Sequence, residues 1–147
     1  MNHLIVMICF CIVIAAIDFK KYRIPDILLL SFALVMIIIE GRQPFESLVV
    51  RLLTAAFSFL LFGAVWYYTR GIGLGDVKYA ALLGYLLGVD RIVQAFIITA
   101  ILGMIVYFAG IKLFNWQKTK KIPYAPFLSA GAVISLFINI NLTGASI

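Results

Sequence analysis

The chain has 147 residues, of which 65% are hydrophobic and only 12% are charged. A soluble domain is typically about 45–50% apolar and about 25% charged, so a soluble fold of this length would leave much apolar surface in water. The formal net charge of +6 does not indicate a nucleic-acid partner, because the basic residues stand at the ends of apolar runs. The composition therefore predicts a membrane protein.

Six apolar segments follow one another along the chain. They cover residues 4–19, 27–39, 48–68, 77–89, 92–114 and 122–140. Each is continuous rather than alternating, which favours helices over the strands of a membrane barrel. No internal repeat, low-complexity stretch or linker separates them. We therefore expect an all-α, polytopic membrane fold with six transmembrane helices, in which residues 1–147 form one domain.

The basic residues are divided unequally between the two sides of this predicted bundle. Nine of the twelve lie in or beside the connections that follow the first, third and fifth segments: Lys20, Lys21, Arg23, Arg70, Lys78, Lys112, Lys118, Lys120 and Lys121. Short basic loops remain in the cytoplasm, so we expect both termini on the outside. Basic residues at this face also predict contact with anionic membrane lipids.

The two cysteines, Cys9 and Cys11, both fall inside the first apolar segment. Their spacing is not that of a metal-binding pair, and no second cluster of ligands is available to complete a zinc site. A buried free cysteine usually behaves as a small hydrophobic residue. We therefore predict no metal site and no cofactor.

Three of the six acidic residues, Asp18, Asp26 and Asp76, lie at span ends on the predicted cytoplasmic side. Acidic groups at membrane depth are costly and are usually functional. The other three acids fall in the opposite connections, where a solvated loop charge is the expected role: Glu40, Glu46 and Asp90.

Each cytoplasmic acid also has a structural interpretation. Asp18 ends the first segment and is also explained as a helix-end charge loosely paired with a nearby lysine. Asp26 follows Pro25, and a proline followed by an acid favours a helix start, so the structural role is preferred for Asp26. Asp76 precedes an apolar run and is also explained as a helix N-cap.

Three glycines precede Asp76 at alternate positions, in the segment 71–76. Glycines lose much conformational entropy when a segment becomes ordered, so three of them favour a backbone that turns tightly or that another group approaches closely. They do not form a phosphate-binding loop, because the Gly-Lys-Ser/Thr ending is missing.

Beyond Asp76, small residues recur at four-residue spacing: Ala80, Gly84 and Gly88. Such a stripe allows a second helix to approach closely. We expect this packing to bring Asp76 towards Asp18.

Two carboxylates in a partly dry site share one proton, because like charges a few ångströms apart do not both ionise. The ionised member then takes a proton from an attacking water, while the protonated member hydrogen-bonds the peptide carbonyl and later assists the departing amine. The chain offers no Ser–His or Cys–His pair for hydrolysis, since its one histidine, His3, is predicted on the other side. Paired aspartates are therefore the available hydrolytic group.

Two non-peptidase interpretations remain. A small proton or ion carrier would relay protons through membrane carboxylates, but it would need acids distributed across the bilayer rather than gathered at one face. A non-catalytic assembly factor would carry a vestigial site.

Three segments resemble the motifs of the type IV prepilin peptidases. The segment 18–26 places Asp18 six residues before Ile24 and Pro25, the segment 73–76 reads glycine–leucine–glycine–aspartate, and the segment 123–128 opens the last span. Glycine–x–glycine–aspartate alone is short and also occurs in presenilin-like proteases, but all three motifs in this order are specific.

The resemblance implies an aspartic endopeptidase with Asp18 and Asp76 as the catalytic pair. It implies that a short basic leader is removed from prepilins or pseudopilins at the cytoplasmic face of a bacterial or archaeal inner membrane, usually after a glycine. The residues of the motifs that would support the site are Pro25, Gly73, Gly75, Lys78, Pro123 and Pro126.

Longer members of that family also carry a cysteine-rich, zinc-binding insertion and methylate the new N-terminus. Here the connection after the first segment spans only a few residues, and the required cysteines are missing. The chain therefore resembles the short, peptidase-only form, for which we expect no methyl transfer.

Overall fold

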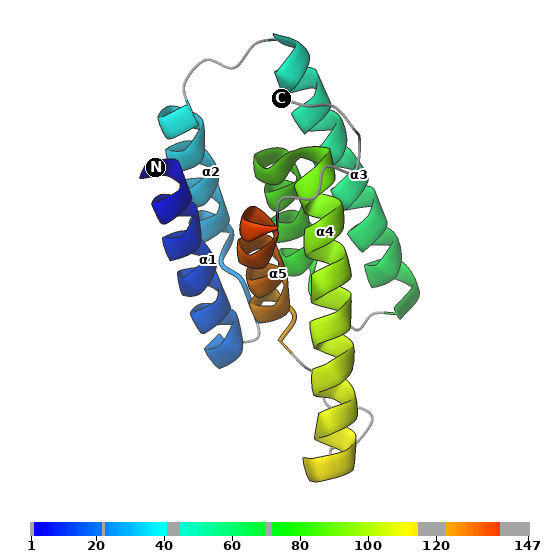
Figure 1. The fold of residues 1–147 in the computed structure, drawn as a ribbon. Helices are drawn as coiled ribbons and strands as arrows, with labels where there is room; N and C mark the ends of the chain where they lie inside the picture. Colours follow the sequence, from blue (N-terminus) through cyan, green and yellow to red (C-terminus); the bar gives the residue numbers. More distant parts are fainter. Residues whose placement is uncertain (1, 22, 41–44, 70–71, 115–122, 139–147) are drawn as a thin grey trace.

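The computed structural model describes residues 2–21, 23–40, 45–69, 72–114 and 123–138. It contains five helices: α1 (Asn2–Lys21), α2 (Asp26–Glu40), α3 (Phe45–Thr69), α4 (Leu74–Phe114) and α5 (Ala125–Phe137) (Figure 1). No strand occurs in these ranges, which confirms the all-α prediction. Two stretches, Ser47–Thr69 and Leu74–Gly110, are long and apolar enough to cross a membrane, whereas α2 and α5 are shorter apolar helices.

Helix α4 is broken at Gly88, which has φ 71° and ψ −180°. This positive φ is readily accessible only to glycine. The chain runs along α3 in one direction before the break and in the other direction after it (Figure 1). Accordingly, Val77 lies beside Gly63 of α3, and the ring of Phe96 contacts that of the neighbouring Phe62 in a tilted arrangement with centroids 4.8 Å apart.

The two parts of α4 correspond to the predicted segments 77–89 and 92–114. The sequence analysis expected a connection at Asp90 and Arg91, but both residues are helical. The reversal occurs at Gly88 instead, because one glycine with a positive φ turns the chain without a loop.

Within the small-residue stripe of α4, Gly84 packs against α3. A Cβ added to Gly84 would contact the side chain of Ser58 and the carbonyl oxygen of Thr54, so this glycine permits a close helix–helix approach. Gly88 contributes the turn instead of a packing contact. The expected stripe therefore exists, but it does not bring Asp76 to Asp18.

Helix α5 lies between α1 and the two parts of α4 (Figure 1). The hydroxyl of Tyr79 in α4 hydrogen-bonds Ser129 in α5 at 2.8 Å and donates to the sulfur of Cys11 in α1 at 3.3 Å. All three residues are buried, and a satisfied polar group inside an apolar core favours one arrangement of the helices. This contact joins three helices at one point.

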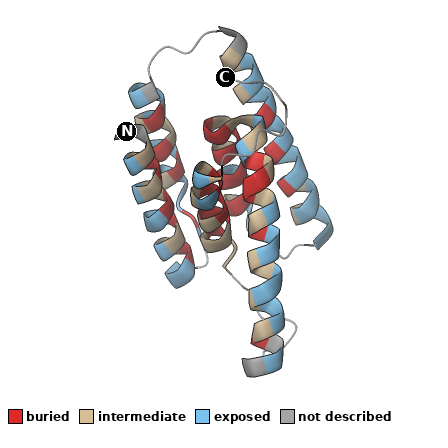
Figure 2. Ribbon diagram, viewed as in Figure 1, coloured by how far each residue is buried: buried red, intermediate tan, exposed pale blue. Residues whose placement is uncertain are grey.

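The outer faces of the bundle are apolar. Figure 2 shows buried residues facing inward and exposed residues covering the outside of α1, α2 and α3 and the second part of α4. Large exposed hydrophobic residues include Ile27, Leu60, Tyr68, Ile101 and Phe108. Exposed apolar surface of this extent suits lipid rather than water.

Four helix termini gather at one end of the bundle. Helix α1 ends there, and α2, α4 and α5 begin there, while the Gly88 turn lies at the opposite end (Figure 1). Several of the basic residues used to predict orientation lie outside the described residues: Arg42, Arg70, Lys118, Lys120 and Lys121.

Two glycines test the packing of α4 on α5. A Cβ on Gly131 would collide with the Thr99 hydroxyl and the Ala95 carbonyl, so we expect Gly131→Ala to lower the free energy of unfolding by about 1–3 kcal/mol. Gly103→Ala is the matched control, because its Cβ would meet nothing within 4 Å and alanine is favoured in a helix by roughly 0.5–1 kcal/mol. Thermal unfolding in detergent measures both. Equal effects of the two changes would contradict this packing.

Candidate active site

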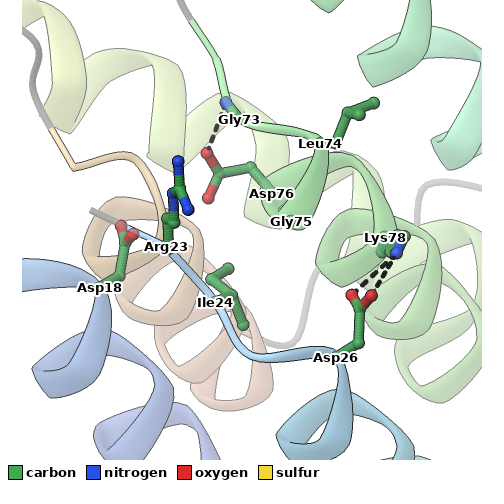
Figure 3. A pocket seen from close by; sticks show the side chains of 9 residues that line it. All are labelled: Asp18, Arg23, Ile24, Asp26, Gly73, Leu74, Gly75, Asp76 and Lys78. Atoms are coloured by element: carbon green, nitrogen blue, oxygen red, sulfur yellow. Dashed lines mark hydrogen bonds and ion pairs between the residues drawn. The ribbon is translucent and has the colours of Figure 1, made fainter. Parts of the chain in front are cut away.

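A cavity of about 420 Å³ opens at the end of the bundle where α1 ends and where α2 and α4 begin (Figure 3). Both aspartates that the sequence analysis selected as a catalytic pair line it. The described residues that line it are Asp18, Arg23, Ile24, Asp26, Gly73, Leu74, Gly75, Asp76 and Lys78.

Asp18 lies in the last turn of α1 and is 3% exposed. Its Oδ2 accepts a hydrogen bond of 3.1 Å from the backbone N–H of Ala125. Ala125 is the first residue of α5, where backbone N–H groups have no partner within the helix and the helix dipole favours a negative charge. The alternative of a loosely paired, exposed charge is therefore wrong for Asp18.

The third motif supplies this helix start. Pro126 occupies the first turn of α5, where a proline removes no helical hydrogen bond. Pro123 and Tyr124 lead into the helix, and Tyr124 accepts the first helical hydrogen bonds from Phe127 and Leu128. The motif that resembles the family therefore lies directly against Asp18.

Asp76 lies in the first turn of α4 and is 7% exposed. Its Oδ2 accepts a 3.1 Å hydrogen bond from the N–H of Gly73, whose own carbonyl accepts from the N–H groups of Asp76 and Val77. Gly73 is thus the N-cap and Asp76 is the third helical residue that reaches back to it. The expectation that Asp76 is itself the N-cap is wrong.

The second oxygen of Asp76, Oδ1, is buried and has no hydrogen-bond partner among the described residues. A buried carboxylate oxygen without a partner is costly in a structural role. It is the expected state of a group that hydrogen-bonds a ligand or water at a site.

Gly75 explains why the segment before Asp76 is rich in glycine. A Cβ on Gly75 would lie 3.2 Å from the Cβ of Ile24 and 3.5 Å from its backbone N and O. The connection between α1 and α2 therefore passes directly against the start of α4. This confirms the interpretation that a glycine here permits a close approach.

Asp26 begins α2, and the carbonyl of Pro25 accepts the first helical hydrogen bonds. The structural role expected for Asp26 as a helix start is confirmed. The sequence analysis missed its partner: Nζ of Lys78 lies 2.8 Å from both carboxylate oxygens of Asp26.

Arg23 was also missed as a member of the site, because the sequence analysis treated it only as a charge that sets orientation. Figure 3 shows its side chain directed between Asp18 and Asp76, with no ion pair drawn to either. Its position on the short connection between Asp18 and Pro25 was the available signal.

Comparison with known proteins identifies the family of this chain. The sequence profile of the type IV leader peptidase family matches residues 5–108. A protein of Bacillus subtilis named prepilin leader peptidase/N-methyltransferase is 29% identical over 132 residues, which cover 89% of this chain and 53% of that protein. Proteins of the same name from Burkholderia pseudomallei and Pectobacterium carotovorum subsp. carotovorum are 30% and 28% identical, covering 84% and 92% of this chain but 42% and 50% of their own lengths.

This chain thus spans about half the length of the curated relatives it matches. No solved structure gave a significant match. The family profile covers α2, α3 and most of α1 and α4, including both aspartates and the connection between α1 and α2. The chain belongs to the type IV leader peptidase family.

Proposed function

We propose that this protein is an intramembrane aspartic endopeptidase that removes the short basic leader from prepilins or pseudopilins. One observation carries the proposal: Asp18 and Asp76, from two distant helices, are both buried and line the same cavity. Each carboxylate has one oxygen fixed by a backbone N–H at a helix start. Such hydrogen bonds lock the orientation of a reacting group.

In the proposed reaction, the two carboxylates share one proton, because both are buried and both line the same cavity. The ionised carboxylate accepts a proton from the attacking water. The protonated carboxylate donates a hydrogen bond to the scissile carbonyl, and a proton then passes to the departing amine as the carbon–nitrogen bond breaks. The free Oδ1 of Asp76 is available for one of these contacts.

We further propose that six helical segments cross the bacterial or archaeal inner membrane, with the cavity at the cytoplasmic face and both termini outside. The exposed basic residues at the cavity end support this orientation: Lys20, Lys21, Arg23, Lys78 and Lys112. Short basic segments remain cytoplasmic and attract anionic lipid headgroups.

The rival proton or ion carrier requires acids at several depths along a path. In the described part of the chain, the two buried carboxylates of the site lie at the same end of the bundle, which supports hydrolysis instead. A vestigial assembly factor would not cleave a prepilin, so a cleavage assay distinguishes it from the peptidase.

We expect Asp18→Asn and Asp76→Asn each to lower the cleavage rate by about 10²–10⁴-fold, since each removes a group that moves a proton in the reaction. The measurement is the mass loss of a model prepilin with a basic leader, a glycine at the cleavage position and one apolar helix. Glu40→Gln is the control, because Glu40 ends α2 opposite the cavity. Cleavage that survives either aspartate change in a folded protein would refute the aspartic mechanism.

Gly75→Ala tests the close approach of the two motif segments. The added methyl must push Ile24 away by a few tenths of an ångström, which displaces the connection that follows Asp18. We expect a fall in kcat of about tenfold, since small misplacements of reacting groups are costly. Gly103→Ala provides the comparison, and equal kcat values for the two variants would show that this approach is not needed.

We propose that this chain does not transfer methyl groups. Incubating the purified protein with the model prepilin and S-adenosylmethionine is expected to give a cleaved product with a free N-terminal amine. Mass spectrometry distinguishes this product from an N-methylated one, and detection of the methylated product would overturn the proposal.

A further inference from the structure

The ion pair between Asp26 and Lys78 stands at the mouth of the cavity and has no part in the proposed chemistry. Nζ of Lys78 lies 2.8 Å from both oxygens of Asp26 (Figure 3). The Lys78 side chain is 51% exposed and that of Asp26 is 70% exposed. An exposed ion pair adds little to folding stability. The role of this pair is therefore inferred from its position in the fold.

The pair joins the two chain segments that carry the aspartates. Asp26 begins α2 at the end of the connection that follows Asp18, and Lys78 lies two residues after Asp76 on α4. The backbone of Ile24 passes against Gly75 between them. The ion pair and this backbone contact are therefore adjacent points of attachment between the same two segments.

Direct attachments between α1 and α4 themselves are few in the described structure. Helix α1 packs on α2 and α5, while α4 packs mainly on α3 and α5, so α5 separates the two helices that hold the aspartates. The hydrogen bond from Tyr79 to Cys11 links them deeper in the core. At the level of the carboxylates, Asp18 is held by Ala125 of α5, and the α1–α2 connection contacts the start of α4 directly.

We propose that Asp26 and Lys78 are positioning residues, which hold the α1–α2 connection against the start of α4 and thereby set the separation of the two catalytic carboxylates. This inference rests on the proposed peptidase function. Nζ of Lys78 contacts both oxygens of Asp26, so the pair holds the two segments together by opposite charge. A rival role, in which Asp26 binds a basic side chain of the leader, would act on substrate affinity instead.

The test compares kcat and KM for cleavage of the model prepilin by Lys78→Ala, Asp26→Asn and the exchanged double variant Asp26→Lys/Lys78→Asp. We expect each single change to lower kcat by about three- to tenfold with KM altered less than about twofold, because the carboxylates lose their productive spacing while the substrate contacts remain. The exchanged pair is expected to recover at least half of the lost kcat. Lys78→Arg, which keeps the charge, is expected to retain most of the activity.

Controls separate this proposal from the function on which it rests. The wild-type protein must cleave and Asp76→Asn must not; failure there concerns the peptidase, not the ion pair. Lys112→Ala removes an exposed lysine remote from the cavity and should behave like the wild type. Thermal unfolding of each variant verifies that it is folded.

Three results would overturn the positioning role while leaving the peptidase intact. The first is an unchanged kcat in both single variants. The second is a rise in KM without a fall in kcat, which would assign Asp26 to leader binding. The third is a Lys78→Arg variant as impaired in kcat as Lys78→Ala, because a retained positive charge should keep the contact with Asp26.

Discussion

Burying two carboxylates at one end of an apolar helix bundle is the constraint on which the rest of this structure depends. A charge removed from water is costly unless hydrogen bonds replace the lost solvent. The bundle meets this requirement with helix starts: α5 presents the N–H of Ala125 to Asp18, and the turn before α4 presents the N–H of Gly73 to Asp76. The positive ends of two helix dipoles therefore face the acids from two directions.

This arrangement requires α4 to reverse direction. Because the chain turns at Gly88, the first part of α4 places Asp76 at the cavity, and the second part returns to support α5 from behind. Thr99 in the returning part donates to the carbonyl of Phe127, close to the start of α5 that holds Asp18. A glycine remote from the cavity thus determines which groups meet at it.

The helices could be predicted because lipid imposes continuous apolar runs. The placement of Asp18 and Asp76 at the same end of the bundle could be predicted because each stands in a local motif at the end of an apolar run. The sequence did not predict contacts made in three dimensions. The partner of Gly84 in α3, the turn at Gly88, and the pairing of Asp26 with Lys78 depend on how helices pack rather than on the local sequence. The sequence placed the N-cap of α4 at Asp76, three residues after the observed N-cap Gly73. Glycine and aspartate both occur at N-caps, so the sequence did not distinguish them.

The charges of the cavity also bear on how the basic leader of the proposed substrate would bind next to a basic protein surface. Among the residues that the structure describes, the lining holds three acidic and two basic side chains. Lys78 is neutralised by Asp26, which leaves Arg23 facing two carboxylates that share one proton in the proposed mechanism. The interior of the cavity is then close to neutral while the surrounding surface is positive. Anionic lipid headgroups attract both basic surfaces and basic peptides, so under the proposed function a basic leader would approach along the membrane and would meet no net repulsion at the acids.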